Sequence, residues 1–293
     1  MPAISEKRLE LGGLRARALE LDGSDGGPAL LLLHGWSDSA DTWRPLLTEL
    51  GRRGRSALAL DLPGFGIADR LDREQEVLPQ FDRFVAAAVR RESGRASGGR
   101  VVIAGNSLGG LAAMRAAEDP ELPLAGVVPI APAGLDMAGW FPLVEGAPLV
   151  RLVLRAPLPL PEAVVREAVG RAYRTLAFAH PHEVDPSVVS SFTRHVRSRR
   201  DVIRVLATNR RLLAEIGEPF RLDRIACPVL LVWGDQDRMV FASGAERVLR
   251  EVPGARLEVI ENCGHCPQIE ATVRVADLLC EFAAQVTERV QAG

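Results

Sequence analysis

The sequence predicts an α/β protein with a doubly wound, mostly parallel sheet and an inserted all-helical segment. Short apolar runs, each typical of a buried parallel strand, alternate with helical patterns along the chain. This alternation stops after about residue 133 and resumes after residue 219, and helical patterns fill the interval. We therefore divide the chain into a core of residues 1–133 and 220–293 and a helical cap of residues 134–219.

The elements of the core follow from local patterns. Polar and apolar residues alternate over 8–11 and 14–21 around Gly12-Gly13, which predicts a hairpin with one solvated face. Apolar runs predict buried strands at 29–33, 56–60, 100–104, 124–130, 227–233 and 256–260. Helices are expected over about 41–50, 81–91 and 111–117, and a terminal helix is expected after residue 270.

Within the cap, prolines punctuate the first part and helical periodicity follows. Apolar residues recur at helical spacing over 162–178, 186–197 and 201–216. Arginine is dense along these helices, and we interpret most of it as a solvated helix face. Recognition of a substrate carboxylate is the alternative interpretation.

Composition limits the class of protein. The 293 residues are 47% hydrophobic, which is enough for a sizeable core, and the net charge of −2 implies no general attraction to nucleic acid or acidic lipid. Four cysteines in a chain of this length do not suggest a disulfide framework. The first residues lack an apolar signal region and no run is long enough to span a membrane. We expect a cytoplasmic protein with a small-molecule substrate and neither a nucleic-acid nor a membrane partner.

The chemistry centres on Gly105-Asn106-Ser107-Leu108-Gly109, which lies between a predicted strand and a predicted helix. A serine on so sharp a turn has a strained backbone and an exposed hydroxyl. The turn also leaves the first amides of the helix unpaired, and the Leu108 N–H could bind a developing oxyanion. A Gly-rich turn without chemistry is the alternative for this pentapeptide alone.

A base and an acid are expected further along the chain. His265 follows the last predicted strand, and Asp235 and Asp237 follow the strand before it. Ligands on parallel sheets bind beyond the carboxyl ends of the strands, where Ser107 also falls. A serine hydroxyl becomes a nucleophile when a histidine held by a carboxylate takes its proton. The order Ser, Asp, His therefore predicts nucleophilic catalysis.

The sequence resembles the α/β-hydrolase fold family, in the subgroup with a serine nucleophile and a helical cap. The matching pieces are His34-Gly35-Trp36, Asp61-Leu62-Pro63-Gly64-Phe65-Gly66, Gly105-Asn106-Ser107-Leu108-Gly109-Gly110, Trp233-Gly234-Asp235-Gln236-Asp237 and Gly264-His265-Cys266-Pro267. The resemblance implies Ser107 as nucleophile, Asp237 as acid and His265 as base. It implies the backbone N–H groups of Trp36 and Leu108 as the oxyanion hole, with no cofactor and no metal.

Alternatives remain for individual residues. Asp136, after the preceding strand, is the fallback acid, because some members of the family carry the acid there. Asp61 is a further carboxylate, and we interpret it as structural. Cys263-Gly264-His265-Cys266 has the spacing of a dithiol redox motif, although it lies far from the chain start at which thioredoxin-like proteins carry theirs.

The leading functional hypothesis is a serine hydrolase of carboxylic esters that forms an acyl-enzyme. The apolar helical stripes of the cap suggest a neutral, apolar acyl group of small to medium size. C–C bond hydrolysis of a dienone-type or β-diketone-type acid is the main alternative. Relatives with that activity share the Gly-Asn-Ser-x-Gly-Gly elbow, but an aromatic residue often follows their active-site histidine, where this chain has Cys266. Perhydrolase, lactonase, amidase and acyltransferase chemistry and a non-enzymatic ligand receptor are the other hypotheses.

Overall fold

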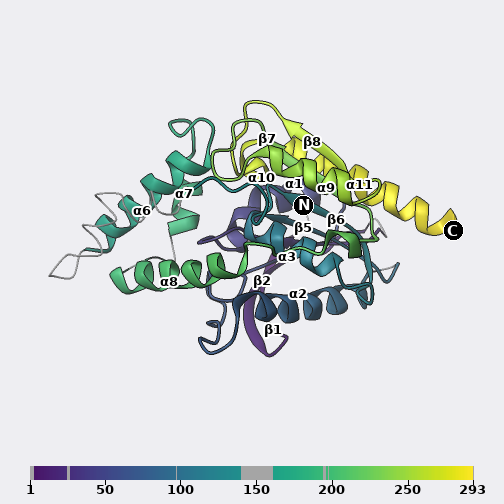
Figure 1. The fold of residues 1–293 in the computed structure, drawn as a ribbon, viewed down its shortest axis with the longest axis horizontal. Coiled ribbons are helices and arrows are strands. Elements are labelled where there is room, and N and C mark those ends of the chain that lie inside the picture. The colour runs from purple at the N-terminus through teal and green to yellow at the C-terminus, as the bar shows by residue number, and fades with distance from the viewer. Residues whose placement is uncertain are drawn as a thin grey trace.

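The computed structural model describes residues 3–24, 27–96, 98–139, 161–193, 196 and 198–292. Within these residues eight strands form one sheet in the order β1-β2-β4-β3-β5-β6-β7-β8 (Figure 1). Strands β1 and β2 pair antiparallel, β2 also pairs antiparallel with β4, and the remaining pairs are parallel. The strands are β1 (Ile4–Leu11), β2 (Leu14–Leu21), β3 (Ala29–Leu33), β4 (Ala57–Leu60), β5 (Val101–Asn106), β6 (Leu124–Ile130), β7 (Leu230–Gly234) and β8 (Arg256–Ile260).

Helices cover both faces of the sheet, which confirms the predicted α/β class. The core helices are α1 (Arg44–Arg52), α2 (Val77–Ser93), α3 (Leu108–Ala117), α9 (Ala245–Glu251), α10 (Pro267–Glu270) and α11 (Thr272–Ala292). Short 3-10 turns occur at η1 (Ala40–Trp43), η2 (Leu222–Arg224) and η3 (Ala242–Gly244). No helix in the described part of the chain is both long and apolar enough to cross a membrane.

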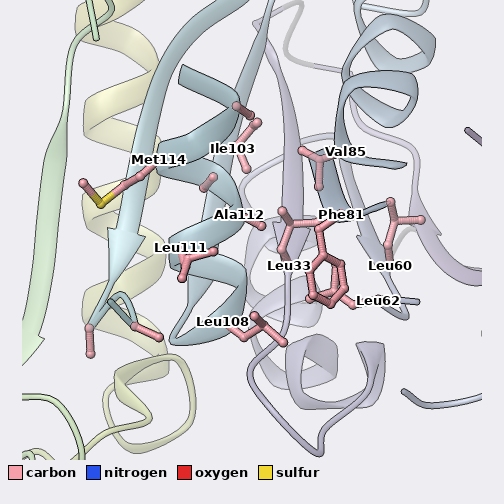
Figure 2. Packing of buried hydrophobic residues seen from close by; sticks show 14 of the residues in the cluster. Leu33, Leu60, Leu62, Phe81, Val85, Ile103, Leu108, Leu111, Ala112 and Met114 are labelled. Atoms are coloured by element: carbon pink, nitrogen blue, oxygen red, sulfur yellow. The ribbon is translucent and has the colours of Figure 1, made fainter. Parts of the chain in front are cut away.

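Two apolar clusters form the core, one on each face of the sheet, because successive strand residues point to opposite sides. On one face Leu31, Leu33 and Ile103 pack under α2 and α3. Figure 2 shows Phe81 of α2 and Leu108 of α3 packed there beside Leu33. On the other face the alternate strand residues pack under α1 and α11, among them Leu30, Leu32, Val102 and Ala104.

Among the residues that the structure describes, three helices lie between β6 and β7 in the chain. They are α6 (Glu162–Ala177), α7 (Pro186–Thr193) and α8 (Arg199–Glu215), and Figure 1 shows them grouped at one end of the molecule. Their starts and ends agree with the predicted helices where the structure describes them. Residues 140–160 of the predicted cap, with its first prolines, lie outside the described residues.

Several expectations were wrong in detail. The helix expected from about residue 41 begins as η1 and becomes α-helical only at Arg44, where Pro45 occupies the first turn. The hairpin has no solvated face along β2, since Ala16 to Leu21 are buried. Two charged residues of β2, Arg17 and Glu20, are buried in ion pairs, and Arg17 is bonded to Asp41 and Asp61. Helices α9 and α10 were not expected.

Candidate active site

Ser107 occupies the turn between β5 and α3, as predicted. Its φ of 52° and ψ of −110° lie in a region that non-glycine residues rarely adopt. The turn is held to the end of β6, because Ser107 N–H donates to Ile130 O at 2.9 Å and Ala133 N–H donates to Ser107 O at 3.0 Å. The strain is therefore fixed by backbone hydrogen bonds of the sheet.

Glycine is required on both sides of Ser107. A Cβ on Gly105 would lie 2.2 Å from Gly109 O, and a Cβ on Gly109 would lie 2.1 Å from Leu33 O. No side chain fits at such distances, so the elbow brings β5, α3 and β3 into backbone contact. Leu108 begins α3, and its N–H has no earlier helical carbonyl to bond.

His265 and Asp237 meet beyond the ends of β8 and β7. The His265 Nδ1 lies 2.7 Å from Asp237 Oδ2, and both side chains are buried. Asp237 Oδ1 accepts hydrogen bonds from the Met239 and Val240 N–H groups at 2.8 and 3.1 Å. A carboxylate held by these donors fixes the orientation of the imidazole.

The other ring nitrogen of His265 is available as a base. A carboxylate accepts at Nδ1–H, which leaves Nε2 of a neutral imidazole with its lone pair. Nε2 is buried and has no hydrogen-bond partner among the described residues, Ser107 included. Such contacts are often long before substrate binds and tighten in the complex.

Asn106 joins the elbow to the histidine loop. Its side-chain Nδ2 donates to the backbone carbonyl of His265 at 2.8 Å. The loop after β3 also packs here, since a Cβ on Gly35 would lie 3.1 Å from Asn106 Oδ1 and 3.5 Å from Ser107 Cβ. Trp36, the other predicted oxyanion donor, follows Gly35 on that loop. The five predicted site residues thus lie at one edge of the sheet, four of them on loops and Leu108 at the start of α3.

The alternative acids bond elsewhere. Asp136 accepts a hydrogen bond from the Ser243 hydroxyl, and Asp235 accepts one from Cys263 N–H at 3.1 Å. Asp61 is fully buried and is bonded to Arg17 and to the Ala40 N–H. Each carboxylate has a structural partner, so the geometry favours Asp237 for the role of the acid.

Both cysteines of the redox-like motif are buried free thiols. Burial raises the pKa of the Cys263 and Cys266 thiols, and so disfavours the thiolates that redox chemistry needs. Cys266 Sγ lies 3.7 Å from the Tyr173 hydroxyl of α6, so it packs against the helical segment.

Glu270 is a residue that our sequence analysis missed. Its carboxylate accepts from Gly264 N–H at 2.9 Å, just before His265, and from Ala179 N–H at 2.8 Å, just after α6. In addition, His265 N–H donates to Ala177 O at 2.8 Å. Burial raises the pKa of Glu270 against these hydrogen bonds, which lower it. The sequence carries no local signal for this role, because one partner of the carboxylate lies 91 residues away in the chain.

An apolar cavity of about 630 Å³, open solvent at its mouth included, opens between the helical segment and the core loops. Trp36 and Met239 line it from the core, and Met239 N–H is bonded to Asp237. Tyr173 also lines it and stacks on Phe192 at a ring-centroid distance of 4.2 Å, while its hydroxyl lies against Cys266 Sγ. The remaining lining residues are Ser37, Val169, Ala172, Leu176, Val196, Val202, Val205 and Leu206.

Comparison with known proteins identifies the class. Residues 30–278 match the model of the alpha/beta hydrolase family, and the chain belongs to this family of enzymes. It is 30% identical over 287 residues to an uncharacterized protein of Mycobacterium tuberculosis, covering 91% of this chain and 77% of the relative.

Relatives with named activities are similar to this chain at lower identity. A pimeloyl-[acyl-carrier protein] methyl ester esterase of Nitrosomonas europaea is 26% identical over 85% of this chain and 93% of its own length. Among solved structures, the 2-hydroxy-6-oxo-6-phenylhexa-2,4-dienoate hydrolase of Rhodococcus sp. strain RHA1 is similar with a TM-score of 0.74 at 22% identity. That match covers 96% of this chain and 99% of the other, and at this identity it shows the shared fold.

Proposed function

We propose that this protein is a serine hydrolase that cleaves carboxylic esters of small to medium apolar acyl groups. The observation that carries the proposal is the buried His265, which is bonded to Asp237 through Nδ1 and has an unpartnered Nε2. A base so oriented beside a strained serine elbow suits the activation of a hydroxyl. The esterase relative supports the same chemistry.

In the proposed reaction Ser107 Oγ attacks the ester carbonyl carbon while His265 Nε2 takes the hydroxyl proton. The N–H groups of Trp36 and Leu108 bind the oxyanion of the tetrahedral intermediate. His265 then gives the proton to the departing alcohol, which leaves an acyl group on Ser107. Water, deprotonated by His265, attacks this acyl-enzyme, and His265 returns the proton to Ser107 Oγ as the acid is released. Asp237 stabilises the imidazolium in both halves.

The cavity supports the choice of acyl group. Its described lining residues include no Arg, Lys or His side chain, so none of them would pair with a substrate carboxylate. This favours an ester of a neutral apolar acid over a dienone-type acid. We also propose that residues 134–219 act as the cap that selects the substrate, since α6 and α8 supply most of the described lining.

The first test is covalent labelling. A fluorophosphonate probe should label the wild-type protein and should not label the Ser107→Ala variant, whereas the control Ser93→Ala, at the half-buried end of α2, should be labelled normally. Hydrolysis of p-nitrophenyl esters by Ser107→Ala should fall by several orders of magnitude. Undiminished labelling of Ser107→Ala would remove Ser107 from the mechanism.

The second test measures the acyl preference. For p-nitrophenyl esters of graded length, kcat/KM should rise from acetyl to a medium chain by about 1–3 kcal/mol per well-filled increment. Ala172→Phe narrows the cavity and should shift the optimum to shorter chains. Ala163→Phe, at an exposed position of the same helix, is the matched control. A flat profile shared by all three proteins would contradict substrate selection by this cavity.

A further inference from the structure

The arginines of α8 gather in a groove on the side of the helix away from the apolar cavity. This groove lies between α8 and the loop that joins β4 to α2, and holds about 1350 Å³ of space, open solvent included. The two sets of lining residues lie on opposite faces of α8, as the period of 3.6 residues requires. The arginines that line the groove are Arg70, Arg73, Arg200, Arg204 and Arg211.

The charge of the groove is not balanced by its own walls. None of its described lining residues is acidic. Arg204 pairs with Asp201 at 2.9 Å, and Arg211 donates to the backbone carbonyl of Asp72 at 2.9 Å. Arg70, Arg73 and Arg200 are exposed and have no acidic side chain within 4.0 Å among the described residues. Three guanidinium groups therefore face the groove with their donors free.

When no anion is bound in the groove, repulsion between its arginines destabilises the folded protein. Arg200 and Arg204 are four residues apart on α8, and like charges at this spacing destabilise a helix. The loop brings Arg70 and Arg73 to the same groove and adds to the repulsion. An anion bound between them would remove this repulsion and accept their hydrogen bonds.

The number of donors indicates the kind of anion. A carboxylate offers two oxygens, which one or two guanidinium groups satisfy. A phosphoryl group offers up to three terminal oxygens and nearly two charges, and suits several forked donors at once. The exposed Ile203 and the hydroxyl of Thr208 also line the groove, and can contact the organic part of a phosphate ester.

We propose that the groove formed by Arg70, Arg73 and Arg200 with Arg204 and Arg211 binds the phosphoryl group of a phosphate ester. This site is separate from the apolar cavity lined by Trp36 and Met239, and the proposal does not depend on the esterase activity. The net charge of −2 does not argue against it, because the described lining of the groove holds five arginines and no acidic residue.

The test uses sn-glycerol 3-phosphate as the soluble probe in isothermal titration calorimetry at low and high salt. The wild-type protein should bind it, and the affinity should fall as ionic strength rises. Succinate, which has a similar charge, should bind at least about tenfold more weakly. Cosedimentation with vesicles that contain phosphatidic acid, a lipid with a phosphate monoester, against phosphatidylcholine vesicles distinguishes a lipid headgroup from a soluble ester. Binding to the vesicles alone indicates a lipid headgroup, and binding to glycerol 3-phosphate alone indicates a soluble ester.

The variant Arg73→Gln/Arg200→Gln tests the residues. It should weaken binding by about tenfold for each arginine, the loss expected for a charge-assisted hydrogen bond. Arg90→Gln/Arg250→Gln removes the same charge from exposed positions on α2 and α9, and should bind like the wild type. Hydrolysis of an acetyl ester should be unchanged in both. Absence of wild-type binding to both probes, equal binding of succinate, or equal affinities of the two variants would overturn the proposal.

Discussion

The side chain of Asn106 donates a hydrogen bond of 2.8 Å to the backbone carbonyl of His265, 159 residues further along the chain. The residue before the proposed nucleophile thus holds the loop of the proposed base. Because both groups are buried, loss of the side chain leaves a carbonyl without its donor. The position of His265 relative to Ser107 therefore depends on this contact.

We expect Asn106→Ala to lower kcat about tenfold to a hundredfold with a smaller change in KM, because a lost buried hydrogen bond costs about 1–3 kcal/mol. Steady-state kinetics on a p-nitrophenyl ester measures the changes in kcat and KM separately. Asn262→Gly is the control, since this exposed residue of the same loop has a φ of 54°, which glycine adopts without strain. Equal kcat values for the two variants would show that Asn106 does not position the base.

Asp237→Asn should retain the fold and lose roughly 10⁴ in kcat. An asparagine that turns its NH₂ group toward His265 makes Nδ1 the acceptor, which places the ring proton on Nε2 and removes the base. Turned the other way, the NH₂ group meets the Met239 and Val240 N–H groups, which cannot accept it. Asp235→Asn keeps an oxygen for Cys263 N–H and should be much less affected, and the same holds for Asp136→Asn. Greater inactivation by either control would reassign the acid.

Glu270→Gln should lower kcat while leaving fluorophosphonate labelling detectable. The amide keeps one acceptor, but the carboxylate accepts from both Gly264 and Ala179. A further readout is the pH dependence of unfolding. Since burial raises the pKa of folded Glu270 above its ordinary value of 4.5, its ionisation costs stability, and this cost grows as the pH rises from 4.5 through the folded pKa.

The difference in unfolding free energy between wild type and Glu270→Gln should therefore shift against the wild type as pH rises through that window. Urea unfolding at several pH values measures it. Glu261→Gln, an exposed glutamate of the preceding turn, should show no such trend. If the difference in unfolding free energy does not depend on pH and kcat is normal, Glu270 does not position the His265 loop.

Asp41 gives a pH dependence of opposite sign. Burial alone would raise the pKa of its carboxyl, but hydrogen bonds and attraction from Arg17 and Arg44 outweigh burial and lower the pKa from 3.8 to about 2. The stabilisation is therefore complete above pH 3.8 and is lost as the pH falls through about 2. We expect Asp41→Asn to cost about 2 kcal/mol near neutral pH, with the deficit shrinking as the pH falls below 3.8. The exposed Asp223→Asn is the control, and a deficit that persists at low pH would contradict the assignment.

Local pattern was sufficient for much of the fold and for part of the site. Apolar runs located the strands and the elbow, because a buried parallel strand and a Gly-x-Ser-x-Gly turn are encoded within a few residues. The choice of Asp237 over Asp235 came from resemblance. Both residues lie on one loop, and the sequence does not show which of the two side chains points toward His265. Periodicity did not reveal Glu270, because its partners are backbone N–H groups up to 91 residues away.

The cavity and the arginine groove were beyond prediction for a related reason. The stripes of α6 and α8 were visible in the sequence, but which stripe faces which loop depends on how the helices pack on the core. The burial of Arg17 in β2 could not be predicted either, because it also depends on residues far away in the chain. Arg17 fitted a solvated face by alternation alone, and its burial depends on acids 24 and 44 residues away.

Helix α8 separates the apolar cavity from the arginine groove. Val202, Val205 and Leu206 line the cavity, and Arg200, Ile203 and Arg204 line the groove. A ligand in the groove that displaces α8 would change the volume of the cavity, and a ligand in the cavity would change the groove in the same way. Thermodynamic linkage makes such an influence mutual, so that the two ligands alter each other's affinity by the same factor. If a bound anion displaces α8, the affinity for the acyl group and the affinity for the anion should therefore change together.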